Sequence, residues 1–200
     1  MIDAKVGLIL GGDAEMPNGK DWRLFSEESA KTFAIQICKY LKETGHKILI
    51  TNGPRTGAFV DVNNRDPNSH KNGEIDRISK AFLDELDKAG FKQGEHFEFY
   101  DFQFGKPSAL KAITAVVYKN KGFMIVPGES TSSISETISI MPIVIYKVDS
   151  MNYTHMNYLN DLLSSQNALI WPNVPTEQQL QNYTPPEPQT LAVVKSLISH

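Results

Sequence analysis

The sequence predicts a Rossmann-like α/β domain, with three α/β/α layers and a mostly parallel sheet of about six strands. Short apolar runs alternate with longer amphipathic patterns, and most of the runs are apolar throughout. Continuous apolar runs are typical of strands covered on both faces, and repeated strand–helix–strand units connect parallel strands. The simplest order for six such strands is 3-2-1-4-5-6.

The strands are predicted from these apolar runs. They cover Lys5–Leu10, His46–Thr51, His96–Phe102, Gly122–Val126, Pro142–Val148 and Asn167–Trp171. The third run, HFEFYDF, alternates apolar and polar residues, which is typical of an edge strand or of a more exposed one.

The helices are predicted from apolar stripes and from their end signals. The first begins after Ser26, which caps it, and ends at Gly45. The others are expected over 73–89, from Pro107 onward, over 130–141, 153–165 and 189–199. Ile75 is expected on the buried face of the second. Residues 1–172 are thus predicted to form one domain, and 173–200 a Pro-rich extended connection followed by a C-terminal helix packed on it.

Composition limits the partners. A net charge of −3 gives no broad basic surface, so nucleic acid is not expected as a partner. No run approaches the roughly 18 apolar residues of a membrane span. The N-terminus has no signal-peptide layout, and the single Cys38 cannot form an internal disulfide, so a cytoplasmic location is predicted. The histidines show no ligand spacing such as H-E-x-x-H, so no metal site is predicted.

The first strand is followed by Gly11 and Gly12. An open sheet of the predicted order binds ligands where the strand order reverses, at the carboxyl ends of its first and fourth strands. The two glycines allow the backbone to approach a ligand there, although a tight strand exit explains them equally well. Their spacing is not G-x-G-x-x-G, and Asp21 after Gly19 and Lys20 breaks the P-loop pattern, which disfavours nicotinamide dinucleotides and P-loop chemistry.

The fourth strand is followed by PGESTSSISET, residues 127–137. A helix that begins there points free N–H groups and its positive dipole end into the crevice, which suits a phosphate or diphosphate without a lysine. Glu136, one turn in, can reach sugar hydroxyls. The predicted phosphate contacts are Ser130, Thr131, Ser132 and Ser133. A capping box with Ser133 as N-cap and Glu136 at its third position fits the same residues, whereas a serine nucleophile does not, because G-x-S-x-G is absent.

The second strand is followed by a long polar loop to Gly73. Thr51, Asn52 and Arg55 leave the same end of the sheet, so Arg55 is predicted to meet an anion, with a solvated loop arginine as the alternative. Long polar loops often act as lids or partner surfaces. His155, after the fifth strand, is the one histidine placed to face the crevice, and it also fits a surface position at a helix start.

The stretch GFMIVPGESTSSISETISIMPIVIY, residues 122–146, resembles the donor-binding half of GT-B glycosyltransferases. The ordered set LILGG (8–12), ITNGPRT (50–56) and STSSISE (130–136) is more similar to the mitochondrial-fission ELM family, which is GT-B-like. GKPSALKAI (105–113) stands where that family has an Asn-Pro-Tyr helix start. The resemblance covers about residues 5–150. It departs at Pro54-Arg55, where the family has two arginines, and at Ile140-Met141-Pro142, where it has Gly-Lys-Pro.

The resemblance implies a domain that binds a nucleoside-diphosphate sugar as its substrate, without a further cofactor. It places the ribose on Glu136 and the diphosphate on Ser130–Ser133. Because a GT-B enzyme uses two such domains, it implies an N-terminal acceptor domain or a second subunit as partner. The chain is then expected to be an excised C-terminal half, a standalone relative or one member of an oligomer. Whether it is a glycosyltransferase by itself stays open, since it should bind more readily than it catalyses.

Two alternatives stay open beside this. Nucleotide phosphoribohydrolases of the lysine-decarboxylase-like type carry PGGxGTxxE after the equivalent strand, and Pro127-Gly128 with Glu136 matches it in part, although Glu129 replaces the second glycine. The other alternative is a non-catalytic protein-interaction module on a degenerate GT-B half. Its contact surfaces would be the loop 53–73 and the Pro-rich C-terminal segment.

Overall fold

The structure, a computed structural model, describes residues 1–71 and 73–186. Its centre is one six-stranded sheet in the order β10-β9-β8-β1-β4-β7, with every neighbouring pair parallel. The strands are β1 (Val6–Ile9), β4 (Ile48–Thr51), β7 (Phe97–Tyr100), β8 (Phe123–Pro127), β9 (Ile143–Tyr146) and β10 (Leu169–Ile170). In chain order this is 3-2-1-4-5-6, so the predicted Rossmann-like fold is confirmed, with the alternating third strand at the edge.

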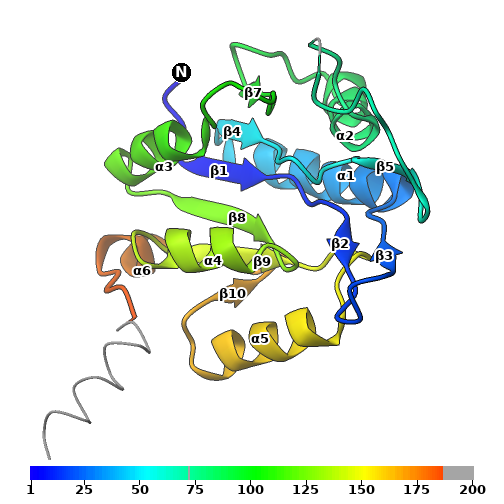
Figure 1. The fold of residues 1–200 in the computed structure, drawn as a ribbon. Helices are drawn as coiled ribbons and strands as arrows, with labels where there is room; N and C mark the ends of the chain where they lie inside the picture. Colours follow the sequence, from blue (N-terminus) through cyan, green and yellow to red (C-terminus); the bar gives the residue numbers. More distant parts are fainter. Residues whose placement is uncertain (72, 187–200) are drawn as a thin grey trace, which may run out of the picture.

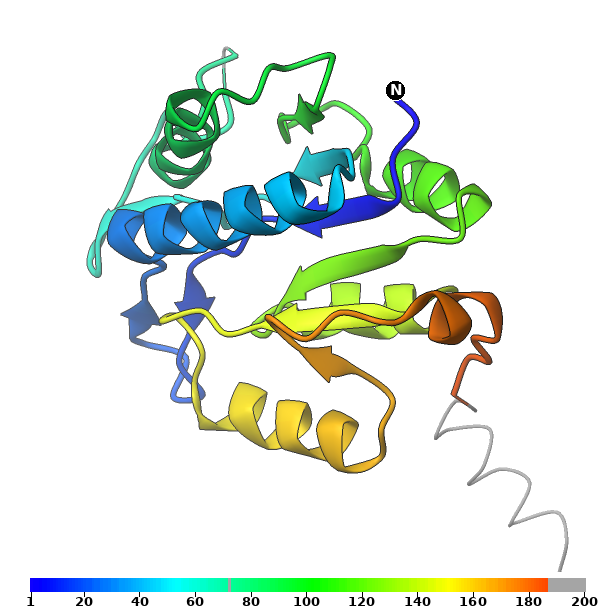
Figure 2. The same cartoon turned by 180° about the vertical axis from the view of Figure 1, so that it is seen from behind.

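Helices cover both faces of the sheet (Figure 1). They are α1 (Glu27–Thr44), α2 (Arg77–Lys88), α3 (Leu110–Lys119), α4 (Thr131–Ile138), α5 (Tyr153–Ser164) and α6 (Glu177–Gln181). The helices α1 and α2 pack together on one face, seen from behind in Figure 2, and α3 and α4 lie on the other. The result is the three-layer α/β/α arrangement that the sequence predicts.

The core explains why the apolar runs form central strands. All four residues of β1, β4 and β9 and all five of β8 are buried, as expected of strands covered on both faces. On the α1 face, the ring of Phe33 stacks on Tyr146 of β9 with 3.9 Å between centroids and 7° between planes. The core therefore packs the end of β9 against α1.

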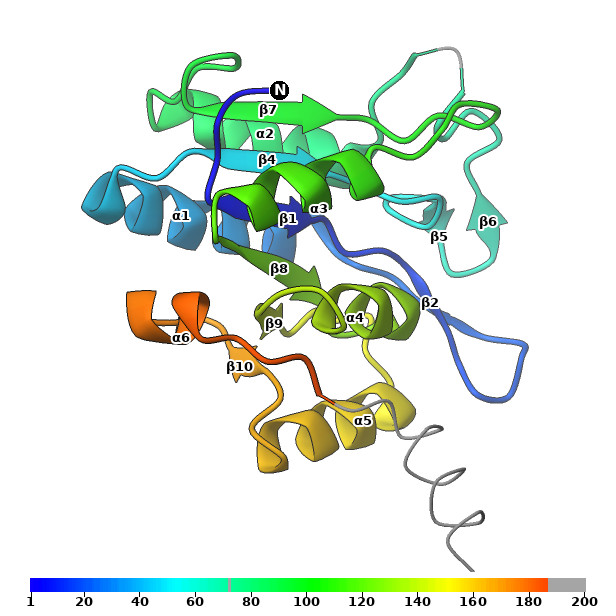
Figure 3. The same ribbon diagram turned by 90° about the vertical axis from the view of Figure 1, so that its left-hand side faces the viewer.

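Two small hairpins stand at the carboxyl edge of the sheet, where Figure 3 shows the strands pointing toward β2, β5 and β6. They pair β2 (Ala14–Glu15) with β3 (Trp22–Arg23), and β5 (Phe59–Asp61) with β6 (Asn64–Arg65). The rings of Trp22 and Phe59 lie 4.4 Å apart and join the two hairpins. The sequence did not predict them, because strands of two or three residues carry no measurable alternation.

Several predicted boundaries are wrong. The helix α2 begins at Arg77 rather than at residue 73, because the Asp76 side chain accepts from the N–H groups of Ile78 and Ser79, and Ile75 before it is 47% exposed rather than buried. The capping box with Ser133 as N-cap does not form, since α4 already begins at Thr131. The connection after residue 173 contains the helix α6, and the helix predicted over 189–199 lies outside the described residues.

Across residues 1–71 and 73–186, none of the helices has both the length and the apolar character required to cross a membrane.

Candidate functional site

The strand order reverses between the central strands β1 and β8. The carboxyl ends of both strands lie at the edge of the sheet that carries the hairpins (Figure 3). Backbone hydrogen bonds join the loop after β1 to the loop after β4. Leu10 donates its N–H to the carbonyl of Thr51 (2.8 Å), and Asp13 donates to the carbonyl of Arg55 (2.9 Å). The segments after β1 and β4 therefore meet at the switch point, next to the end of β8, where ligands bind in open α/β sheets.

The glycine turn after β1 is held by side chains of other strands. Gly11 donates its N–H to the hydroxyl of Tyr146 (2.6 Å), and Gly12 donates to Oε1 of Glu129 (2.7 Å). A Cβ on Gly12 would lie 2.9 Å from the carbonyl carbon of Arg55, so only glycine fits against this backbone. Both N–H groups thus donate to side chains of the protein and not to a ligand. The backbone that Gly12 allows to come close is that of Arg55, in the loop after β4.

Glu129 is the least expected residue at the switch point. Its side chain is 3% exposed, and its Oε2 has no hydrogen-bond partner among the described residues. Burial raises the pKa of this carboxyl to about 7, against the opposing effects of the Gly12 N–H and the charge of Arg55. From the sequence, Glu129 was noted only as the residue that replaces the second glycine of PGGxGTxxE. The available signal was an acidic residue two positions after a fully buried strand.

The start of α4 lies beside Glu129 and has no side-chain cap. Ser130 is its N-cap residue, but the Ser130 hydroxyl donates to the hydroxyl of Ser133 (2.9 Å) instead of accepting from the helix. Thr131 and Ser132 are exposed. Four other helices do have side-chain caps, formed by Ser26, Asp76, Asn152 and Thr176. The first-turn N–H groups of α4 are therefore left without a side-chain acceptor within the described part of the chain.

Arg55 brings positive charge to the same edge. Its side chain is exposed, and its charge lowers the pKa of the Glu129 carboxyl. Burial, and then the charge of Arg55, lower the pKa of His155 as well. His155 is half-buried at the start of α5, where its Nδ1 accepts from the N–H of Asn152 (3.2 Å). Arg55 is thus within electrostatic range of both residues.

Glu136 lies on the outer side of α4, away from the glycine turn. It is exposed and lines a groove of about 590 Å³ between α3 and α4, together with Lys111, Tyr118 and Ile140. At about 1.5 Å of rise per residue, Glu136 stands about 7.5 Å along the helix from Thr131. The structure therefore separates the two predicted contacts, phosphate and ribose, along one helix.

Thr51 and Asn52 are buried on the side of β7. The Thr51 hydroxyl donates to the carbonyl of Tyr100 (2.9 Å). The Asn52 amide nitrogen lies 2.8 Å from Oδ2 of Asp76 and 2.7 Å from Oδ1 of Asp101. The Asn52 carbonyl oxygen accepts from the N–H of Phe102 (2.6 Å). Their polar atoms are thus bound within the protein, and the structure does not bring them together with the start of α4.

His70 belongs to the same buried network, with Asp76 and Asp101 close by. Its Nε2 lies 2.8 Å from the carbonyl of Thr56 and its Nδ1 lies 3.1 Å from the carbonyl of Phe102. Because carbonyl oxygens only accept, each of the two contacts needs a proton on its ring nitrogen, so the pair favours the imidazolium form. Burial lowers the pKa of His70, but Asp101 and Asp76 outweigh this, and the net shift is upward.

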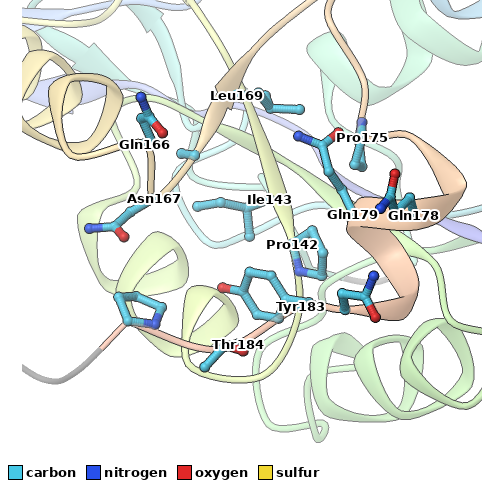
Figure 4. A pocket seen from close by; sticks show the side chains of 13 residues that line it. Pro142, Ile143, Gln166, Asn167, Leu169, Pro175, Gln178, Gln179, Tyr183 and Thr184 are labelled. Carbon is cyan, nitrogen blue, oxygen red and sulfur yellow. The ribbon is translucent and has the colours of Figure 1, made fainter.

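A separate pocket of about 410 Å³ opens at the amino ends of β9 and β10, on the opposite edge of the sheet (Figure 4). Prolines, carboxamides and Tyr183 line it, and no described residue of its lining is charged. It holds none of the residues predicted to bind the nucleotide. We therefore place the candidate site at the switch point.

The chain matches no protein-family model, no curated protein and no solved structure. Its function must therefore be argued from the geometry of the switch point.

Proposed function

We propose that this domain binds a nucleoside diphosphate at the switch point, as the donor-binding half of a GT-B-like glycosyltransferase binds its nucleotide sugar. The observation that carries the proposal is the uncapped start of α4 at the carboxyl end of β8. Helix N-termini bind anions through free N–H groups and the dipole, without a lysine. Ser130 and Ser133 add hydroxyl groups to this end, and exposed Arg55 adds a positive charge.

The groove between α3 and α4 supports a nucleoside next to the diphosphate. Glu136 lines this groove about 7.5 Å along the helix from Thr131, within the length of a nucleoside diphosphate whose phosphates lie at the helix start. Its carboxylate accepts from a pair of vicinal hydroxyls. The side chains of Leu110 and Tyr118 give the groove an apolar wall against which a base can pack.

The test places a competing negative charge at the helix start. Ser132→Asp stabilises α4 through its dipole, yet its carboxylate repels a diphosphate by about 3 kcal/mol per unit of phosphate charge at about 5 Å and an effective dielectric of about 20. We expect the affinity for UDP, GDP and their sugars, measured by calorimetry, to fall tenfold or more, with no loss of thermal stability. Gln178→Asp, in the first turn of α6 at the opposite edge, adds the same charge and should leave affinity unchanged.

Absence of binding by every nucleotide tested would overturn the proposal. Equal affinity for the parent protein and Ser132→Asp would remove the start of α4 from the site.

A further inference from the structure

Glu129 presents a hydrogen-bonding problem within the switch point. Its Oε1 is bound by the Gly12 N–H at 2.7 Å, which fixes the carboxyl between the glycine turn and the start of α4. Its Oε2 is buried and unpartnered among the described residues. An ionised carboxylate in this place would leave one charged oxygen without a donor. The free energy of burying an unpaired charged group is several times that of burying an unpaired neutral one.

The charges around Glu129 come from three elements. Arg55, in the loop after β4, favours the ionised form, and Asp13, in the loop after β1, disfavours it. Tyr146 of β9 also faces Glu129, but its hydroxyl already accepts from Gly11 and donates to the carbonyl of Ile9 (3.1 Å). Arg55 is the only cation among these groups, and it is exposed, so it does not neutralise a buried carboxylate.

A ligand at the start of α4 changes this balance. A diphosphate there brings negative charge to the residues that directly follow Glu129 and competes for the positive field of Arg55 and of the helix dipole. The buried Glu129 carboxylate has little solvent to screen it, so retaining its charge next to a bound diphosphate costs free energy. The neutral form of Glu129 removes that repulsion and keeps the bond from Gly12.

We propose that the switch-point site takes up its anionic ligand together with one proton from solvent, which Glu129 carries on Oε2. This rests on the proposed function and adds regulation to it: nucleotide binding weakens as the pH rises. Glu129 acts as a positioning residue that holds the glycine turn in either form and removes its own charge when the ligand arrives. Above pH 7, affinity falls about tenfold per pH unit, since each proton taken up gives that slope.

The experiment is calorimetry with UDP-glucose and GDP-mannose from pH 6 to 8.5, because their phosphodiester groups do not titrate in that range. Measurements in two buffers of different ionisation enthalpy give the number of protons taken up, expected to approach one per ligand at pH 8. Glu129→Gln keeps the oxygen that Gly12 binds and cannot ionise. Its affinity should match the parent protein at pH 6, stay constant to pH 8.5 and involve no proton from this residue.

His155→Asn, made alone and with Glu129→Gln, serves as the control, since His155 is the second titratable group in the field of Arg55. A proton uptake that persists in Glu129→Gln and disappears in His155→Asn would overturn the assignment. So would a parent affinity that is independent of pH.

Sulfate, which does not titrate in this range, separates the two proposals. If sulfate binds with proton uptake that Glu129→Gln abolishes, while no nucleotide binds, the coupling holds and the nucleotide proposal fails. If nucleotides bind without proton uptake, the proposed function holds and the coupling fails.

Discussion

Ionisable residues buried in the loops at the carboxyl edge determine how those loops are joined. Asp13 is fully buried and accepts from the N–H of Phe25 (2.9 Å) and of Phe59 (3.0 Å), which ties both hairpins to the end of β1. Burial raises the pKa of Asp13, although these two bonds and the charge of Arg77 oppose the shift. Hydrogen bonds to a buried carboxylate such as Asp13 hold these loops together, because the loops have too few apolar side chains to form a core of their own.

His70 gives a prediction at the scale of one residue. Since both of its ring nitrogens face carbonyl oxygens and its pKa is raised, we expect an imidazolium at pH 7. Long-range ¹H–¹⁵N spectra should show both nitrogens protonated at pH 7, with a midpoint above the ordinary value of 6.5. A single neutral tautomer at pH 7 would contradict this. His96, half-buried just before β7, accepts the N–H of Lys92 at its Nδ1 (3.1 Å) and shows in the same spectrum a ring nitrogen that acts as an acceptor.

Some of these residues were predictable from the sequence, and others were not. Arg55 and Ser130–Ser133 were placed at the correct edge, because the carboxyl ends of parallel strands share one edge and the strand order follows from the chain. Glu129 and Asp13 were not singled out. Their importance depends on complete burial beside the ends of distant strands, which no local pattern encodes.

At the scale of elements, the presence or absence of a side-chain cap distinguishes a helix start with a structural role from one that can bind a ligand. The start of α2 is saturated: the Asp76 carboxylate accepts from the N–H groups of Ile78 and Ser79, from the Ser79 hydroxyl and from Asn52. Among the described residues, no side chain caps the start of α4. The sequence predicted the first cap, Ser26, correctly but placed the start of α2 too early. Apolar Ile75 fits the spacing of the buried stripe of α2, but the N-cap Asp76 follows it, so the helix begins only at Arg77.

Asp76→Ala tests the role of the start of α2. The variant loses the helix cap and leaves the buried Ser79 hydroxyl without its acceptor, so the free energy of unfolding should fall by about 2–4 kcal/mol. Asp84→Ala, on the exposed face of the same helix and paired only with Lys80, should cost about 0.5 kcal/mol or less. Urea unfolding midpoints of the two variants measure the difference. Equal losses would contradict a capping role for Asp76.

At the scale of the whole molecule, the sheet brings buried titratable groups and their loops into one cooperative unit. The order β7-β4-β1-β8-β9-β10 follows from the alternation of apolar runs with helices, and this is why the fold was predictable. The hairpins and the α3–α4 groove were not, since they depend on contacts between elements. Because Glu129 and His70 both lie in this unit, their titration affects the stability of the entire domain.

Stability should therefore fall as the pH rises from about 5 to 8. The folded Glu129 carboxyl has a pKa near 7 against an ordinary 4.5, so it holds a proton that the unfolded chain has lost. This costs up to about 3 kcal/mol once the pH exceeds 7. The pKa of His70 is also raised, and its stabilising charge is lost as the pH rises through that folded value.

Glu129→Gln should be as stable as the parent protein at pH 5 and more stable at pH 8, as measured by urea unfolding. Glu136→Gln removes the same charge from an exposed position of α4 and should change stability by about 0.5 kcal/mol or less at either pH. An equal gain from Glu129→Gln at pH 5 and pH 8 would show that packing, and not ionisation, limits stability at the switch point.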